Sequence, residues 1–181
     1  ILGTCSYDGK IYTFMDESQS PKLYEYDSKE DKWNEINTPM DDMYYYDGGM
    51  AAGTDGIYIT YALKSNNEIK VKKYADGQWS DVGNIGKLGY ALKIAVDAEN
   101  TVYLAFNDFG EGNHHFVNRY YNGNWENVGA TYITATGGGR SKLTLDSNGT
   151  PYVSYYDQYQ NKVFVSKLVG ELWLQIGSGA V

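Results

Sequence analysis

The chain has 181 residues, of which 42% are hydrophobic and 21% are charged. This length and composition are those of one folded domain with a buried core, and they exclude an intrinsically disordered chain. The formal net charge of −8 argues against a nucleic-acid partner, because binding to a phosphate backbone depends on clustered Lys and Arg.

The rare residues and the start of the chain set further limits. The single cysteine, Cys5, cannot form an internal disulfide. No run approaches the roughly 18 apolar residues of a membrane-spanning helix, and the first residues lack the basic region of a signal peptide. A chain that begins at Ile1 rather than at Met suggests a processed or excised segment.

A repeat runs through the whole chain. Four tryptophans are separated by steps of 46, 46 and 48 residues: Trp33, Trp79, Trp125 and Trp173. Four tyrosines keep nearly the same step, at 46, 45 and 49 residues: Tyr12, Tyr58, Tyr103 and Tyr152. Each tyrosine follows a turn signal such as Asp8-Gly9 or Asn148-Gly149, and such pairs favour the tight turns of β-hairpins.

Alternation of apolar and polar residues predicts four strands, A to D, in each copy of the repeat. In chain order they cover residues 2–6, 11–14, 23–26 and 33–36, then 50–54, 57–61, 69–74 and 79–82. The third and fourth copies give 92–96, 102–106, 116–121 and 125–128, then 143–145, 152–156, 163–168 and 173–176. Several strands are apolar on both faces, as expected for sheets packed between neighbouring sheets, and no helical periodicity is present.

A step of this length predicts an all-β fold, a β-propeller with four four-stranded antiparallel blades. A β-sandwich is the structural alternative, but it would not explain a step that is held through four copies. The predicted blades cover approximately residues 1–46, 47–90, 91–139 and 140–181 of a single domain.

Two repeat families are similar to parts of the chain. The segment Leu23-Tyr24-Glu25-Tyr26-Asp27, followed by Trp33, Ile36 and Pro39-Met40, resembles a kelch blade, although Thr13-Phe14-Met15-Asp16 stands where kelch repeats have a diglycine. Residues 74–83, 121–129 and 146–153 are similar to the repeats of secreted bacterial propellers. The resemblance implies an extracellular or bacterial cell-surface protein, and it leaves the function open because propellers host many functions.

Closure of the ring has two solutions. With strands A to D in sequence order, no spare strand is left to join the first blade to the last. The four blades either close into a four-blade ring or form half of an eight-blade ring that a second copy completes as a homodimer, because an open arc would expose two apolar faces.

The B-to-C and D-to-A loops emerge on one face of a propeller, and loops on a rigid scaffold commonly carry binding residues. The candidate ligand-binding residues on this face are Asp16, Tyr44, Tyr45, Tyr46, Tyr90, Asp108, Phe109, Tyr132, Arg140, Asp157 and Tyr159. Aromatic rings beside carboxylates suit carbohydrate, whose rings stack and whose hydroxyl groups form hydrogen bonds.

Each part of this candidate site also has a purely structural interpretation. Asp16, Asp108 and Asp157 fall at nearly the same loop position in three blades, where they would accept sugar hydroxyls or bind Ca²⁺, or would simply cap turns. The tyrosines from 44 to 46 would form a sugar platform or fill the gap between two blades. His114 and His115 are adjacent in a strand and would point apart, so no metal shared between them is expected, and no other cofactor is expected.

The sequence therefore predicts a non-enzymatic binding propeller that recognises a glycan or a protein through its B-to-C and D-to-A loop face. A glycan-cleaving enzyme is an alternative that would need two carboxylates about 5 to 10 Å apart across a cleft. Asp41, Asp108 and Asp157 are open candidates for such a pair, and nothing selects them. A unit whose main property is self-association into a complete ring is the third possibility.

Overall fold

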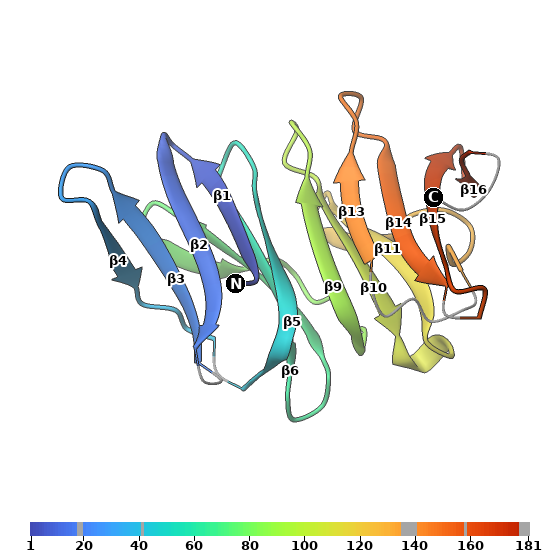
Figure 1. The fold of residues 1–181 in the computed structure, drawn as a ribbon, viewed down its shortest axis with the longest axis horizontal. Helices are drawn as coiled ribbons and strands as arrows, with labels where there is room; N and C mark the ends of the chain where they lie inside the picture. The colour runs from blue at the N-terminus through green and yellow to red at the C-terminus, as the bar shows by residue number, and fades with distance from the viewer. Residues whose placement is uncertain (18–19, 41, 135–140, 158, 178–181) are drawn as a thin grey trace.

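The computed structural model describes residues 1–17, 20–40, 42–134, 141–157 and 159–177 (Figure 1). The described residues form sixteen strands in four separate antiparallel sheets, and each sheet is a meander of four strands in sequence order. We call these sheets blades one to four. The prediction of an all-β protein with four four-stranded blades is confirmed.

The strand bounds follow the predicted order. Blade one has β1 (Gly3–Tyr7), β2 (Lys10–Glu17), β3 (Ser20–Asp27) and β4 (Lys32–Ile36). Blade two has β5 (Met43–Ala52), β6 (Ile57–Leu63), β7 (Ile69–Ala75) and β8 (Gln78–Asp81). Blade three has β9 (Gly89–Val96), β10 (Val102–Asp108), β11 (His114–Tyr121) and β12 (Asn124–Asn127), with the short helix η1 (Phe109–Glu111) between β10 and β11. Blade four has β13 (Ser141–Leu145), β14 (Pro151–Asp157), β15 (Lys162–Val169) and β16 (Leu172–Gln175).

Several residues that were predicted to lie in loops lie in strands instead. Asp16, Asp108 and Asp157 are at or near the ends of β2, β10 and β14, and each is paired with a residue of the following strand. The run from 44 to 46 is in β5, and Tyr90 is in β9. The predicted loops were too long because they were assigned from the turn preference of Asp. Backbone hydrogen bonding between two strands continues as long as the strands stay in register, even where such residues occur.

The hydrophobic core lies between blades rather than within a single blade. Three clusters fill the three junctions, and β10 is buried along its entire length. Representative residues of the clusters, from the first junction to the third, are Phe14, Leu23 and Ile59, then Ile69, Leu92 and Leu104, then Val117, Val153 and Phe164. This packing explains why the second strand of each repeat is apolar on both faces.

A hydrogen bond from the repeat tryptophan marks every junction. The indole N–H in the last strand of one blade donates to a backbone carbonyl just after the last strand of the preceding blade. The three bonds are Trp79 Nε1 to Asn37 O at 2.8 Å, Trp125 Nε1 to Val82 O at 2.7 Å, and Trp173 Nε1 to Val128 O at 3.0 Å. We call this the indole–carbonyl contact.

The four blades form an open arc. The innermost strands pack in succession, β1 on β5, β5 on β9 and β9 on β13, and Figure 1 places blade one and blade four at opposite ends of the row. Of the two predicted arrangements, the closed four-blade ring is therefore not the one that this chain adopts. No helix in the described residues is long and apolar enough to cross a membrane.

Candidate functional site

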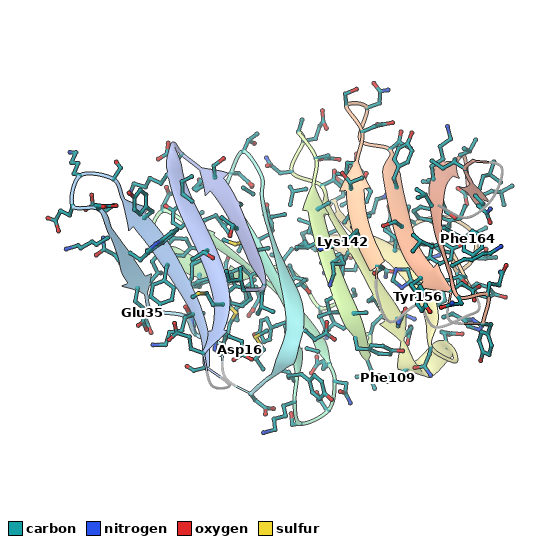
Figure 2. All side chains as sticks on the ribbon, in the orientation of Figure 1. Asp16, Glu35, Phe109, Lys142, Tyr156 and Phe164 are labelled. Atoms are coloured by element: carbon teal, nitrogen blue, oxygen red, sulfur yellow. The ribbon has the colours of Figure 1, made fainter. Side chains whose placement is uncertain are left out.

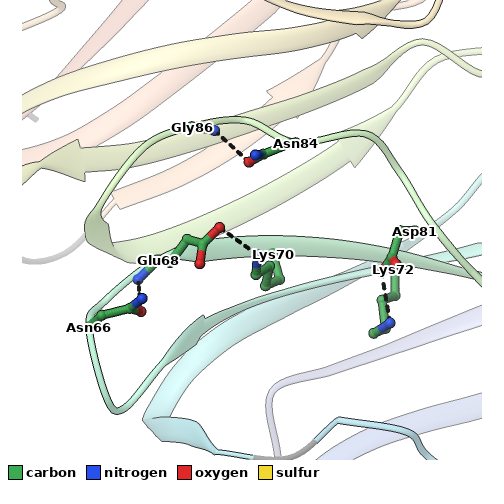
Figure 3. A network of polar contacts seen from close by, with 7 residues as sticks. All are labelled: Asn66, Glu68, Lys70, Lys72, Asp81, Asn84 and Gly86. Carbon is green, nitrogen blue, oxygen red and sulfur yellow. Dashed lines mark hydrogen bonds and ion pairs between the residues drawn. The ribbon is translucent and has the colours of Figure 1, made fainter.

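The connector from blade two to blade three is held in place by backbone and side-chain hydrogen bonds (Figure 3). Asn84 Oδ1 accepts from the backbone N of Gly86 at 3.0 Å, and Ile69 N donates to Lys87 O at 3.0 Å. Beside this connector, Glu68 forms an ion pair with Lys70 (Figure 3). The backbone of Lys87 is thus tied to the first residue of β7.

Lys87 supplies the counter-charge for a buried carboxylate. Asp108 is 2% exposed, and its Oδ2 lies 2.7 Å from Lys87 Nζ. Its other oxygen, Oδ1, accepts from the backbone N of Gly110 at 2.8 Å, which caps η1. A buried charge is costly unless it is paired and hydrogen-bonded, and Asp108 meets both conditions.

Several aromatic side chains lie near this ion pair. Tyr90 and Phe109 have ring centroids 5.0 Å apart, and Phe109 is 46% exposed. Tyr132 is 40% exposed, with its ring centroid 4.1 Å from that of His114. Phe116 links Tyr132 to the ion pair, because its ring centroid lies 6.3 Å from that of Tyr132 and 5.8 Å from Lys87 Nζ.

We name this group the blade-three loop cluster. Its members are Lys87, Tyr90, Asp108, Phe109, His114, Phe116 and Tyr132. Figure 2 shows Phe109 at the lower end of the arc, the same end as Asp16. Four of the predicted site residues, Tyr90, Asp108, Phe109 and Tyr132, are therefore brought together in one blade.

The buried residue His115 holds the backbone next to Tyr132 in place. His115 is fully buried, and its Nδ1 lies 2.5 Å from Asn107 Oδ1. Its backbone pairs with the connector to blade four, since Ile133 N donates to His115 O at 2.8 Å and His115 N donates to Thr134 O at 3.2 Å. These bonds position Tyr132 against His114. Burial lowers the pKa of His115 to about 4, so the ring is neutral at physiological pH.

The other predicted residues are dispersed. Asp16 is half-buried in β2, and Tyr44 in β5 is 44% exposed. Asp157 is buried, and its Oδ1 accepts from the backbone N of both Tyr159 and Gln160 at 2.9 Å. Tyr45 and Tyr46 belong to β5, and Arg140 lies outside the described residues.

The acidic positions share a structural role in two blades. Asp108 and Asp157 each accept a backbone N–H from the turn that follows, as the turn-capping interpretation predicts. Within the described ranges, no group of three or more His, Cys, Asp or Glu side chains is arranged to hold a metal ion.

A cavity that the sequence did not predict lies among the hairpin turns, at the strand ends opposite to Phe109. It has a volume of about 350 Å³ and lies between blades two and three, where Tyr58, Lys73, Asp81, Asn100, Tyr120 and Tyr121 line it. Tyr58 OH donates to Asp55 Oδ1 at 2.9 Å, and burial together with this bond raises the pKa of Tyr58. Tyr58 was interpreted only as a landmark of the repeat, so its second role had no separate signal in the sequence.

Comparison with solved structures places this architecture among known folds. Aleuria aurantia lectin, solved as a mutant in complex with Fucalpha1-6GlcNAc, matches with a TM-score of 0.70 at 13% identity over 99% of this chain and 62% of that chain. An AofleA mutant from Arthrobotrys oligospora matches with a TM-score of 0.68 at 10% identity over 98% and 56% of the two chains. TolB from Acinetobacter baumannii matches with a TM-score of 0.62 at 16% identity over 93% and 41%.

No protein-family model matches the chain, and no curated protein sequence matches it significantly. The chain spans less than two thirds of the length of each of these three solved proteins. At such low identities the likeness shows the fold alone. The sheets, their packing and these neighbours together establish that the described chain is four blades of a β-propeller.

Proposed function

We propose that the protein is a non-enzymatic carbohydrate-binding propeller, and that it binds a glycan at the blade-three loop cluster. The observation that carries this proposal is that two exposed rings, Phe109 and Tyr132, belong to the cluster around the ion pair of Lys87 with the buried Asp108. Phe109 follows Asp108 in the chain, and Tyr132 contacts Phe116, whose ring centroid lies 5.8 Å from Lys87 Nζ. Each ring is held by a second ring, Tyr90 or His114, so the stacking surface is ordered before a ligand arrives.

The chemistry of this surface suits a sugar. The C–H face of a pyranose would stack on Phe109 or Tyr132, as apolar ligand groups do on aromatic rings. Lys87, which keeps part of its side chain exposed, would donate to a hydroxyl oxygen. The complex of Aleuria aurantia lectin with Fucalpha1-6GlcNAc gives a fucose-containing glycan as the first ligand to test.

The glycan-cleaving alternative has less support. It needs one carboxylic acid and one carboxylate free to exchange protons across a cleft. Asp108 is committed to Lys87 and to the cap of η1, and Asp157 is committed to the turn at Tyr159. Neither carboxylate is presented to a ligand in the way that acid–base catalysis requires, and Asp41, the third candidate, lies outside the described residues.

The proposed function also has implications for the location of the protein and for the class of its partner. A glycan ligand suits an extracellular or cell-surface location. A protein ligand on the same face is the other class of partner, and a glycan array run beside a pull-down on immobilised cell-surface proteins would separate the two classes.

The test is a glycan array followed by titration calorimetry on the best ligand. Phe109→Ala and Tyr132→Ala are expected to weaken binding by about tenfold or more, equivalent to about 1.4 kcal/mol, because each removes one face of the stacking surface. Both rings are partly exposed, so neither change should unfold the protein.

Two matched controls locate the site. Tyr159→Ala removes an aromatic ring from the loop face of blade four, where the side chain is 80% exposed, and should leave affinity unchanged. Tyr121→Ala removes a ring from the cavity between blades two and three, where the side chain is 52% exposed. Loss of binding in Tyr121→Ala alone would move the site to that cavity, and an array without any ligand would overturn carbohydrate binding itself.

A further inference from the structure

The outer face of blade one is an apolar groove, and no blade of the described chain packs against it. The groove has a volume of about 520 Å³, and its lining includes Ile1, Ile11, Met15, Tyr24 and Trp33. Ile11 is 45% exposed and Trp33 is 47% exposed. Large apolar side chains gathered on one exposed face commonly mark an interface.

The repeat identifies what this face is built to contact. Because Tyr12, Tyr58 and Tyr103 are equivalent landmarks, Ile11 is equivalent to Ile57 and Val102, and both of these are fully buried. In the same way, the equivalents of Thr13 are Ile59 and Leu104, which are also fully buried. In blades two and three this face packs on the preceding blade, so the groove is one half of a blade junction.

The outer face of blade four is the other half of such a junction. Tyr12, Tyr58 and Tyr103 are at most 7% exposed because each faces the next blade, whereas their equivalent in blade four, Tyr152, is only half-buried. Apolar residues on the same face of blade four are exposed by 39% to 57%: Val163, Val169, Leu172 and Leu174.

The indole–carbonyl contact supplies the register between the two faces. Trp33 packs against Tyr26 with ring centroids 5.2 Å apart, much as Trp79 packs against Tyr74 at 5.0 Å. No acceptor within the described ranges meets the indole N–H of Trp33, unlike that of Trp79. At the other end of the arc, Ile176 is equivalent to Val82 and Val128, whose carbonyls accept from the next blade.

The glycine that follows the acceptor carbonyl also differs between an internal junction and the free end of blade four. Gly129 has a φ of 87° and approaches the next blade so closely that a Cβ there would lie 2.8 Å from Trp173 Nε1. Its equivalent Gly177 keeps a φ of 85°, with no following blade in the described chain. Within the described chain, the indole of Trp33 in blade one thus has no carbonyl to donate to. The carbonyl of Ile176 and the glycine Gly177 in blade four have no tryptophan of a following blade to meet.

We propose that a second copy of the chain docks head to tail, with its blade four on the outer face of blade one. In this register, Trp33 Nε1 donates to the backbone O of the partner's Ile176. A second copy is the favoured occupant because it carries the matching face in the matching register, and the contact continues a junction that the chain already forms three times. Two such contacts would close a ring of two chains.

The first experiment measures mass by sedimentation over a range of concentrations. The wild-type chain is expected to assemble, whereas Ile11→Asp and Leu174→Asp should each be monomeric, because each places a carboxylate in one half of the junction. Both side chains are exposed, so the monomer should remain folded, and far-ultraviolet circular dichroism would verify this.

Mixing the two variants tests the polarity of the contact. Ile11→Asp retains an intact blade-four face and Leu174→Asp retains an intact blade-one face, so the mixture should form a one-to-one complex and nothing larger. A wild-type chain that stays monomeric at every concentration would overturn the proposal. Assembly of Leu174→Asp alone would overturn it as well, because two blade-one faces would then be meeting each other.

A second experiment tests the register. Trp33→Phe should weaken assembly by about fivefold for each contact, and so by about 25-fold for a ring that contains two contacts, because each contact loses one hydrogen bond. The melting temperature of the monomer should be unchanged. Trp79→Phe is the matched control, since it breaks the same contact inside one chain. It should lower the melting temperature and leave assembly unchanged, and the reverse pattern would contradict the register.

Discussion

His115 is a titratable residue that lies in the fully buried interior. Its ring is fully buried beside Asn107, the nearby charge of Lys93 opposes protonation, and burial is the larger cause of the lowered pKa. The side chain contributes shape and one hydrogen bond as a neutral ring. A proton on it would add a charge that the interior cannot solvate.

The stability of the protein should therefore fall as the pH falls from about 6.5 towards 4. The folded-state pKa is about 4 and the unfolded value is 6.5, so between these values the unfolded chain binds the proton and the folded chain does not. The stabilisation is complete above about pH 6.5, and the loss at low pH is on the order of 3 kcal/mol.

Urea unfolding at several pH values measures this slope. His115→Gln removes the titration, so its free energy of unfolding should depend less steeply on pH over the same interval. Equal slopes for the wild-type protein and the variant would show that other groups govern acid stability.

At the scale of elements, the blades are joined by specific polar contacts as well as by apolar packing. Asp47 of β5 accepts from the backbone N of Ala91 at 2.8 Å and of Leu92 at 2.9 Å, both in β9. Burial raises the pKa of Asp47, and the two backbone bonds partly oppose that rise. One carboxylate thus satisfies two amides at the irregular start of β9, where Ala91 has a φ of 59°.

Asp47→Ala should lower the free energy of unfolding by roughly 2 to 4 kcal/mol, because it leaves two backbone N–H groups without an acceptor. Asp47→Asn keeps one oxygen acceptor and should recover part of the loss. Chemical denaturation of the three proteins checks the order, which would be contradicted if the Asn variant were the least stable.

A pair of glycines in one blade separates backbone strain from junction packing. Gly123 has a φ of 82° with nothing within 4 Å of a Cβ placed there, whereas a Cβ on Gly129 would meet Trp173. Gly123→Ala should cost roughly 1 to 2 kcal/mol for the left-handed backbone alone. Gly129→Ala should cost at least about 1 kcal/mol more, because the indole of Trp173 must move. Thermal unfolding of the two variants measures the difference.

At the scale of the whole molecule, the two middle blades are covered on both faces and the two end blades on one. In a monomeric variant such as Ile11→Asp, the amides of β6 and β10 should exchange with deuterium most slowly, and those of β2 and β14 faster. Hydrogen exchange followed by mass spectrometry tests this. Equal protection in all four blades of a monomer would contradict it.

The repeat made the four-blade architecture predictable from the sequence. It did not predict whether the blades form an open arc or a closed ring. Trp79, Trp125 and Trp173 recur because each closes the same junction, so their spacing predicted four blades. Whether blade one meets blade four depends on the small rotation at each junction, which no single residue type determines.

The candidate site was predictable only in part, for a similar reason. Phe109 and Tyr132 were identified by composition, but Lys87 was not, because its pairing with Asp108 arises from the way a connector of blade two lies along blade three. Asp108 and Asp157 were placed in loops because Asp favours turns, and the structure shows that they cap those turns from the ends of strands.

The indole–carbonyl contact has a consequence for the way such a chain can change in length. Every junction uses an indole N–H as the donor and, as the acceptor, a backbone carbonyl three or four residues after the tryptophan of the preceding blade. None of these residues senses how many copies precede or follow it. Duplication or deletion of one whole copy, cut between the end of β8 and the start of β9, would leave each remaining junction chemically intact. The number of blades is then set by how many repeats the gene encodes and not by the residues of any one blade. Chains with different numbers of repeats would use the same type of contact at each junction.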